Sequence, residues 1–149
     1  IIRFISMITV LAALLLMYAY GSDEHSVRST SGGFLPNISK ATIFYAGLGV
    51  FAIFNILMNW GIRVYRDATG FDPTSRFFRS ETHKAGILFW LTLVLAALNF
   101  LLSFMLAYIG FIKIEGFSAQ QDYIAMPFIG VSLFFVVLIG LVAAIFRKE

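Results

Sequence analysis

The residues best suited to chemistry in this sequence are amides and hydroxyls that lie inside long apolar segments. Asn55, Asn59 and Asn99 lie well within such segments, and Thr92 and Ser103 share a segment with Asn99. These groups either line a cavity for a polar solute or hydrogen-bond between helices. Apart from Arg3 and Arg63 near the segment ends, these segments contain no Asp, Glu, Lys, Arg or His, although ion paths and proton relays in membranes use such residues. The sequence therefore favours bonding between helices and argues against a proton- or sodium-driven transporter within this chain alone.

A second group of residues is cationic and lies around the middle of the chain: Arg63, Arg66, Arg76 and Arg79. Guanidinium groups bind phosphate through paired hydrogen bonds, so the four arginines could hold a phosphate or an anionic lipid headgroup. The alternative is that they only orient the chain, because cytoplasmic loops of membrane proteins are rich in Lys and Arg. We expect them to contact lipid headgroups or an acidic surface of a partner, not a substrate.

Cofactor ligands and catalytic groups are sparse. His25 and His83 are expected near opposite membrane faces, so they cannot hold one haem between them, and we interpret both as surface histidines. The sequence has no cysteine, which excludes thiolate metal sites, iron–sulfur clusters and disulfides. No nucleophile stands beside a base, and no pair of carboxylates lies inside an apolar segment. We expect no cofactor, no metal and no catalytic residue in this chain.

The composition places the protein in a membrane. Of its 149 residues, 60% are hydrophobic and 13% are charged, and the mean hydropathy is +0.88. A soluble domain of this composition would expose too much apolar surface to water. The net charge of +3 is modest, and the placement of the basic residues suggests orientation in a membrane and not a nucleic-acid partner.

Four apolar segments are long enough to span a bilayer, which takes roughly 20 residues of helix. The spans are expected at about 1–20, 41–64, 85–112 and 125–146. The first could instead be a secretory signal with Arg3 as its basic end, but its apolar run is long for a signal core. We predict one all-α domain over residues 1–149, an antiparallel up-down bundle of four transmembrane helices.

Small and polar residues recur along one face of the third span at helical spacing. This stripe consists of Ala85, Thr92, Ala96, Asn99, Ser103, Ala107 and Gly110, and the matching face of the second span consists of Ala41, Tyr45, Gly49, Ala52, Asn55 and Asn59. Depths counted from Arg63 and from Lys84 put Asn55 level with Thr92. The same count puts Asn99 opposite Leu48 and Gly49, and a glycine there would let the two backbones approach.

The basic residues predict the orientation. One side collects eight of them, Arg3, Arg63, Arg66, Arg76, Arg79, Lys84, Arg147 and Lys148, and the other collects three, Arg28, Lys40 and Lys113, which together account for all 11. Both termini are therefore expected in the cytoplasm. In the central cytoplasmic loop, Asp72 before Pro73 predicts a short surface helix from Pro73 to about Ser80.

Two functions remain open from the sequence. The first is a non-catalytic accessory subunit of a larger membrane complex, energy-transducing or secretory, which packs through small and polar helix faces. Its partners would be other integral membrane subunits and phospholipids, with no nucleic acid, in a bacterial inner membrane. The alternative is a small self-contained protein that works as a homo-oligomer, either a carrier or an enzyme acting on lipid or thiol conjugates.

Overall fold

The protein is built from four long apolar helices packed together. The computed structural model describes residues 1–20, 39–71, 75–77, 79–115 and 125–147. Its helices are α1 (Ile2–Tyr20), α2 (Lys40–Asp67), α3 (Glu81–Glu115) and α5 (Ala125–Phe146). Each is long and apolar enough to cross a membrane. The four helices closely match the four predicted spans, and they make the chain a multi-pass integral membrane protein.

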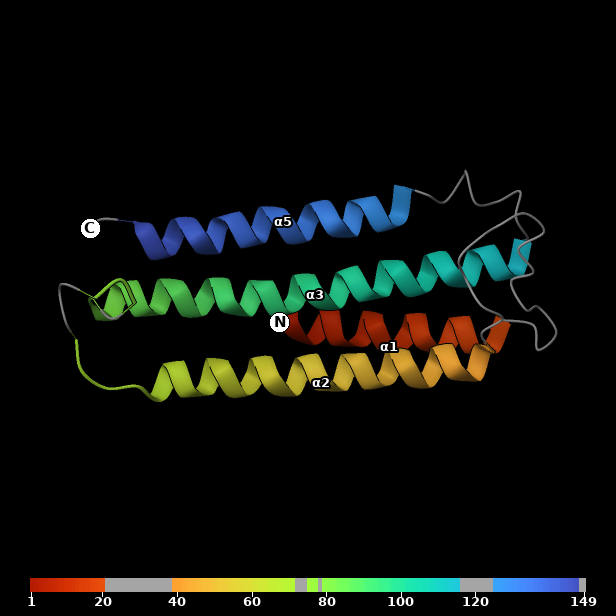
Figure 1. The fold of residues 1–149 in the computed structure, drawn as a ribbon, viewed down its shortest axis with the longest axis horizontal. Helices are drawn as coiled ribbons and strands as arrows, with labels where there is room; N and C mark the ends of the chain where they lie inside the picture. Colours follow the sequence, from red (N-terminus) through yellow and green to blue (C-terminus); the bar gives the residue numbers. More distant parts are fainter. Residues whose placement is uncertain (21–38, 72–74, 78, 116–124, 148–149) are drawn as a thin grey trace.

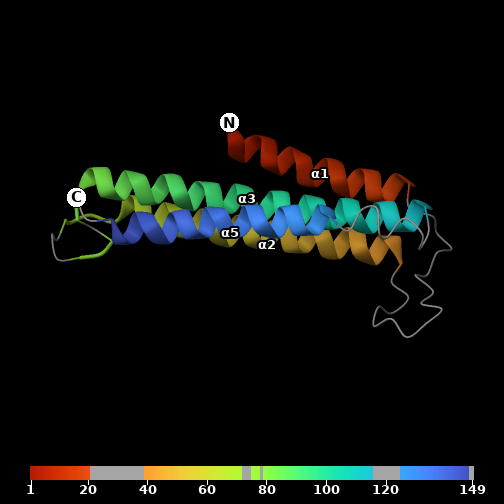
Figure 2. The same ribbon diagram turned by 90° about the horizontal axis from the view of Figure 1, so that it is seen from above.

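The arrangement is organised around α3, which packs against each of the other three helices. In Figure 1, α2, α3 and α5 lie side by side with α3 in the middle, and consecutive helices run in alternate directions. Figure 2 shows α1 on one side of this layer. The bundle therefore differs from a square in which each helix has two equivalent neighbours, because α5 lies on the far side of α3 from α2.

Local signals set the helix ends. Ser39 caps α2, since its Oγ accepts a hydrogen bond from the Thr42 N–H at 3.1 Å. After α2, Gly70 takes a φ of 100°, which favours glycine. At the start of α3, the Ser80 Oγ accepts a hydrogen bond from the His83 N–H at 3.1 Å. Helix α3 thus begins directly after Ser80.

The predicted surface helix from Pro73 to Ser80 lies partly outside the described residues, which omit 72–74 and 78. The described residues of this segment form bends and irregular backbone and not helix. One physical reason is local bonding: the Ser75 Oγ accepts the Phe77 N–H at 3.2 Å, a turn that competes with helical hydrogen bonds.

The apolar core lies where α1, α2 and α3 meet. Val10, Leu14, Phe51 and Leu106 form one buried cluster. Gly47 makes this contact possible, because a Cβ added there would lie 2.9 Å from Leu14 Cδ2 and 3.2 Å from Leu106 Cδ2. The absence of a side chain at this position lets α2 approach the other two helices closely.

Helix α5 packs on α3 through two glycines. A Cβ on Gly130 would lie 3.2 Å from the Leu101 Cα and 3.2 Å from the Phe104 ring, and Gly130 is the residue of α5 that is fully buried. Farther along α5, Gly140 lies directly against the Trp90 ring. Most large side chains of α5 remain exposed in this chain. Helix α5 thus packs against α3 along one of its faces.

The position of α1 changes one premise of the orientation count. Ser6 on α1 lies beside Asn99 on α3, and the two helices run in the same direction. Arg3 is three residues before Ser6, so it lies near the level of Ala96. That level is twelve residues from Lys84, or about 18 Å along the helix axis. Arg3 therefore does not share the end of the bundle where Lys84 lies, and it drops out of the eight basic residues that the sequence assigned to that end.

Candidate functional site

The structure brings three polar side chains from three helices together in the middle of the bundle. Asn55 Nδ2 donates to Asn99 Oδ1 at 2.8 Å, and Asn99 Nδ2 lies 3.4 Å from Asn55 Oδ1 in return. Asn99 Nδ2 also donates to Ser6 Oγ at 3.2 Å. All three residues are buried, and Asn99 is only 2% exposed. Asn99 is therefore bonded to α1 and α2 at once.

A second polar contact between α1 and α3 lies one turn away. Ser103 Oγ donates to the Asn99 carbonyl oxygen at 2.9 Å and lies 3.4 Å from Thr9 Oγ1. Thr9 Oγ1 in turn donates to the Ser6 carbonyl oxygen at 2.8 Å. We call Ser6, Thr9, Asn55, Asn99 and Ser103 the polar cluster. It joins the three helices that also share the apolar core.

The hydrogen bonding of this cluster suits a structural role better than solute binding. Asn55 Nδ2 is shared between Asn99 and the Phe51 carbonyl oxygen, which it reaches at 2.9 Å. Ser6 Oγ donates to the Arg3 carbonyl oxygen at 2.8 Å while it accepts from Asn99. Within the described residues, no buried side-chain nitrogen or oxygen lacks a hydrogen-bond partner. The cluster therefore satisfies itself, and a bound solute would have to break bonds already made.

The depth alignment predicted from the sequence is wrong by about two helical turns. Asn55 pairs with Asn99 and not with Thr92, whose hydroxyl bonds the Leu88 carbonyl oxygen of its own helix. Lys84 explains the error, because its Nζ donates to the Ala68 carbonyl oxygen at 2.6 Å. Lys84 is therefore level with Ala68 and not with Arg63. Counted from this contact, Asn55 and Asn99 lie 13 and 15 residues in, so they meet.

The other predicted packing residues differ from one another in how far they are buried. Gly49 was expected opposite Asn99, but a Cβ added to it would meet nothing within 4 Å, and the close approach occurs at Gly47 instead. Ala96 is buried, Ala107 and Thr92 are half-buried, and Asn59 is half-buried and lies outside the polar cluster.

The four arginines predicted to act together divide into two pairs. Arg63 and Arg66 stay exposed on α2, and Arg66 pairs with the neighbouring Asp67 at 3.3 Å. Arg76 and Arg79 instead contact the end of α5. The Arg79 guanidinium donates to the Arg147 carbonyl oxygen at 2.9 Å and to the Ser75 carbonyl oxygen at 3.2 Å.

Arg76 completes this contact with α5. Its guanidinium carbon lies 5.3 Å from the centroid of the Phe146 ring, a cation–π distance. We call the end of the bundle where α2 ends, α3 begins and α5 ends the arginine-rich end. There, Arg76 and Arg79 tie the segment before α3 to the last turn of α5.

His83 is not the surface residue that the sequence suggested. It is 7% exposed, and its Nε2 lies 3.0 Å from the Arg76 carbonyl oxygen. The imidazole thus holds the segment before α3 against the first turn of that helix. No sequence signal distinguishes this histidine from an exposed one, because the contact depends on how the preceding segment folds back.

Sequence reasoning also left Ser6 and Thr9 out of the candidate site. Both lie on a weak small and polar face of α1, and this face was the available signal. It could not be matched to Asn99 and Ser103, because the first span could pair with the second span, the third span or both. The parallel arrangement of α1 and α3 decides the match.

The geometry defines a class of protein and not a reaction. The chain is a multi-pass integral membrane protein in which a buried polar cluster joins three helices and Arg76, Arg79 and Arg147 lie together at one end. Within the described residues, no group of three or more His, Cys, Asp or Glu side chains is placed to hold a metal ion. Comparison with protein-family models, curated proteins and solved structures finds no significant match.

Proposed function

We propose that this protein is a non-catalytic subunit of a larger membrane assembly, with other integral membrane subunits as its partners. The observation that carries the proposal is that α5 contacts the rest of the bundle along only one of its faces. Of its 22 residues, all of them described, Gly130 alone is buried in this chain. Large apolar side chains cover its other faces, among them Phe135 and Ile139. Such a helix has free faces on which further helices can pack.

The polar cluster supports the same proposal from inside the protein. Its donors and acceptors are engaged with one another, so the centre of the bundle acts as a joint between α1, α2 and α3. Interhelical hydrogen bonds of this kind hold helices together without catalysing anything. The surfaces left for function are then the outer faces of the helices and the arginine-rich end.

The proposal includes an orientation and a location. The arginine-rich end and the C-terminus lie at the cytoplasmic face of a bacterial inner membrane, and the N-terminal end of α1 points toward that face. Seven basic residues favour this orientation against three at the opposite end, with Arg3 left out of the count. Single cysteines at Ser31 and Thr69 test it, since no native cysteine interferes. In intact cells, a membrane-impermeant thiol reagent should label Ser31→Cys and not Thr69→Cys. The reverse pattern would contradict the orientation.

The experiment that tests the assembly combines size measurement with site-directed crosslinking. A photoreactive amino acid replaces Phe135, which is exposed on α5, and Phe4, which is exposed on α1, serves as the comparison site. The subunit proposal predicts extraction as a particle of defined mass that contains other subunits, with Phe135 crosslinked to one of those subunits. A particle made only of copies of this chain would refute it and favour a self-contained carrier or enzyme.

A further inference from the structure

A groove of about 810 Å³ opens between α3 and α5 at the arginine-rich end. Its mouth and its depth differ in chemistry. The residues at the mouth are Thr82, His83, Phe146 and Arg147, and the residues deeper in are Gly86, Trp90, Gly140, Ala143 and Ala144. The groove is thus polar and cationic at the helix ends and apolar with small residues farther in. This order matches an amphiphile with a charged head.

We propose that this groove holds one anionic phospholipid, with its phosphate at Arg147 and the upper part of an acyl chain beside Trp90. Depth supports the match. Trp90 lies six residues beyond Lys84, about 9 Å farther along α3 at 1.5 Å per residue. Lys84 itself bonds the Ala68 carbonyl oxygen just after the end of α2. The groove therefore runs from the level of the helix ends toward the membrane interior.

The charges at the mouth favour an anion. Arg147 lines the groove. Beside the groove, Arg76 contacts the Phe146 ring, and Arg79 donates to the Arg147 carbonyl oxygen. Among the described residues, the ion pair at this end joins Arg66 to Asp67, and no ion pair of Arg76, Arg79 or Arg147 with another described residue is found. The groove mouth also lies at the first turn of the 35-residue helix α3, whose N-terminus favours negative charge and already carries Glu81.

The floor of the groove is shaped for a chain and not for a helix. Gly140 accommodates the Trp90 ring, because a Cβ there would lie 2.2 Å from two of the ring carbons. Trp90 thus closes one side, and the neighbouring alanines leave room beside it. A second groove, between α1 and α3, is lined almost wholly by apolar side chains and has no charge to select a headgroup.

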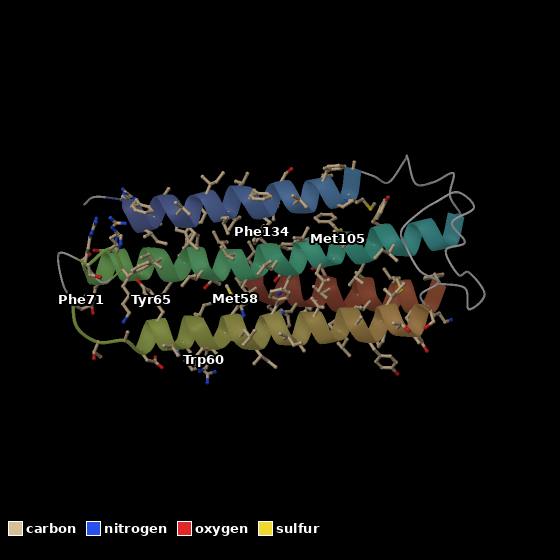
Figure 3. All side chains as sticks on the ribbon, in the orientation of Figure 1. Met58, Trp60, Tyr65, Phe71, Met105 and Phe134 are labelled. Atoms are coloured by element: carbon tan, nitrogen blue, oxygen red, sulfur yellow. The ribbon has the colours of Figure 1, made fainter. Side chains whose placement is uncertain are left out.

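Tryptophan fluorescence with brominated lipids tests the proposal, because the protein has only two tryptophans, one in the groove and one outside it. Trp60 is 67% exposed on α2, and Figure 3 shows its side chain pointing away from the bundle. A Trp60→Phe protein reports on Trp90, and a Trp90→Phe protein reports on Trp60. Each is reconstituted in phosphatidylcholine vesicles that contain increasing fractions of phosphatidylglycerol with brominated acyl chains.

The expected result is selective quenching of Trp90. One arginine near a membrane surface favours an anionic lipid by about fivefold, so Trp90 should prefer brominated phosphatidylglycerol to brominated phosphatidylcholine by at least about fivefold. Trp60 should show little preference, since it reports on bulk lipid. Equal preference at both tryptophans, or none at Trp90, would overturn the proposal. Loss of the preference on adding millimolar inorganic phosphate would also overturn it, because the site would then take a free anion.

Two variants locate the lipid in the groove. Ala143→Leu fills the apolar part, and Val142→Leu places the same side chain on an exposed neighbouring position of α5. Arg147→Gln removes the charge at the mouth, and Arg63→Gln removes an exposed charge on α2. The first member of each pair should lower the preference at Trp90 by about fivefold, and its control should not. Equal effects within a pair would show that Trp90 senses general lipid enrichment and would overturn the proposal. The result does not depend on whether the chain works in a larger assembly.

Discussion

Replacing Asn99 with alanine should weaken the joint between α1, α2 and α3. The Asn99 amide takes part in three interhelical contacts, at 2.8 and 3.4 Å with Asn55 and at 3.2 Å with Ser6. Interhelical hydrogen bonds in membranes are worth about 0.6 kcal/mol on average and up to about 1.7. Three such contacts predict that Asn99→Ala lowers the free energy of unfolding by about 2 kcal/mol.

A double-mutant cycle separates the bonds from the rest of the substitution. Asn55→Ala, Asn99→Ala and the double variant should show a coupling free energy of about 1 kcal/mol, because the pair shares two of the three contacts. The measurement is reversible unfolding by sodium dodecyl sulfate in lipid–detergent bicelles, followed by circular dichroism. Asn59→Ala is the matched control, since Asn59 is half-buried on α2, the helix that carries Asn55, and lies outside the polar cluster.

Two outcomes would refute the reasoning. Additive effects, within the roughly 0.3–0.5 kcal/mol expected of independent sites, would mean that the Asn55–Asn99 bonds contribute nothing to stability. A loss from Asn59→Ala as large as that from Asn99→Ala would mean that removal of any amide from these helices destabilises the protein. In either case the polar cluster would not be the joint that the geometry indicates.

Further predictions concern the glycines. Gly47→Ala should destabilise the protein by about 1–3 kcal/mol, because the added Cβ meets the buried Leu14 side chain, and overpacking has this cost. Gly49→Ala, two residues away, should instead be neutral or stabilising by up to about 1 kcal/mol, since its Cβ meets nothing and alanine favours helix; the same unfolding assay compares the two, and equal losses would contradict the packing. Gly140→Ala should displace the Trp90 ring, and the near-ultraviolet circular dichroism of that tryptophan should fall; an unchanged spectrum would show that the ring does not rest on Gly140.

The spans could be predicted from the sequence because their signal is local. Each apolar run carries enough hydropathy and length by itself to identify a membrane helix, and the four helices of the structure follow these runs closely. The small and polar stripe on α3 is also local, since it depends only on helical spacing, and Asn99 on that stripe is bonded to α1 and α2. The residues that a helix exposes on each of its faces can therefore be predicted from the sequence of that helix alone.

Register and partner choice depend on contacts between distant residues, and these the sequence does not contain. The bond between Lys84 and the Ala68 carbonyl oxygen sets the relative depth of α2 and α3. The residue types at these two positions do not predict this bond. The same holds for His83, which is buried only because the preceding segment brings the Arg76 carbonyl oxygen to its ring. The residues of α3 predicted opposite Asn55 and opposite Gly49 are both wrong, because the relative depth of the two helices could not be read from the sequence.

The two sides of α3 are joined to their neighbours by different forces, and this difference has a consequence for function. Toward α1 and α2, directional hydrogen bonds of the polar cluster fix the register, because a slip of one turn would leave amides unpaired in an apolar medium. Toward α5, the close contacts in the middle of the bundle involve glycines and apolar rings, which a slip or tilt would rearrange without leaving a polar group unsatisfied. The arginine-rich end adds the directional bond from Arg79 to the Arg147 carbonyl oxygen, which holds α5 at that end only. Helix α5 is thus held to α3 by packing without directional bonds except at the arginine-rich end, and it carries both the proposed docking faces and one wall of the proposed lipid groove.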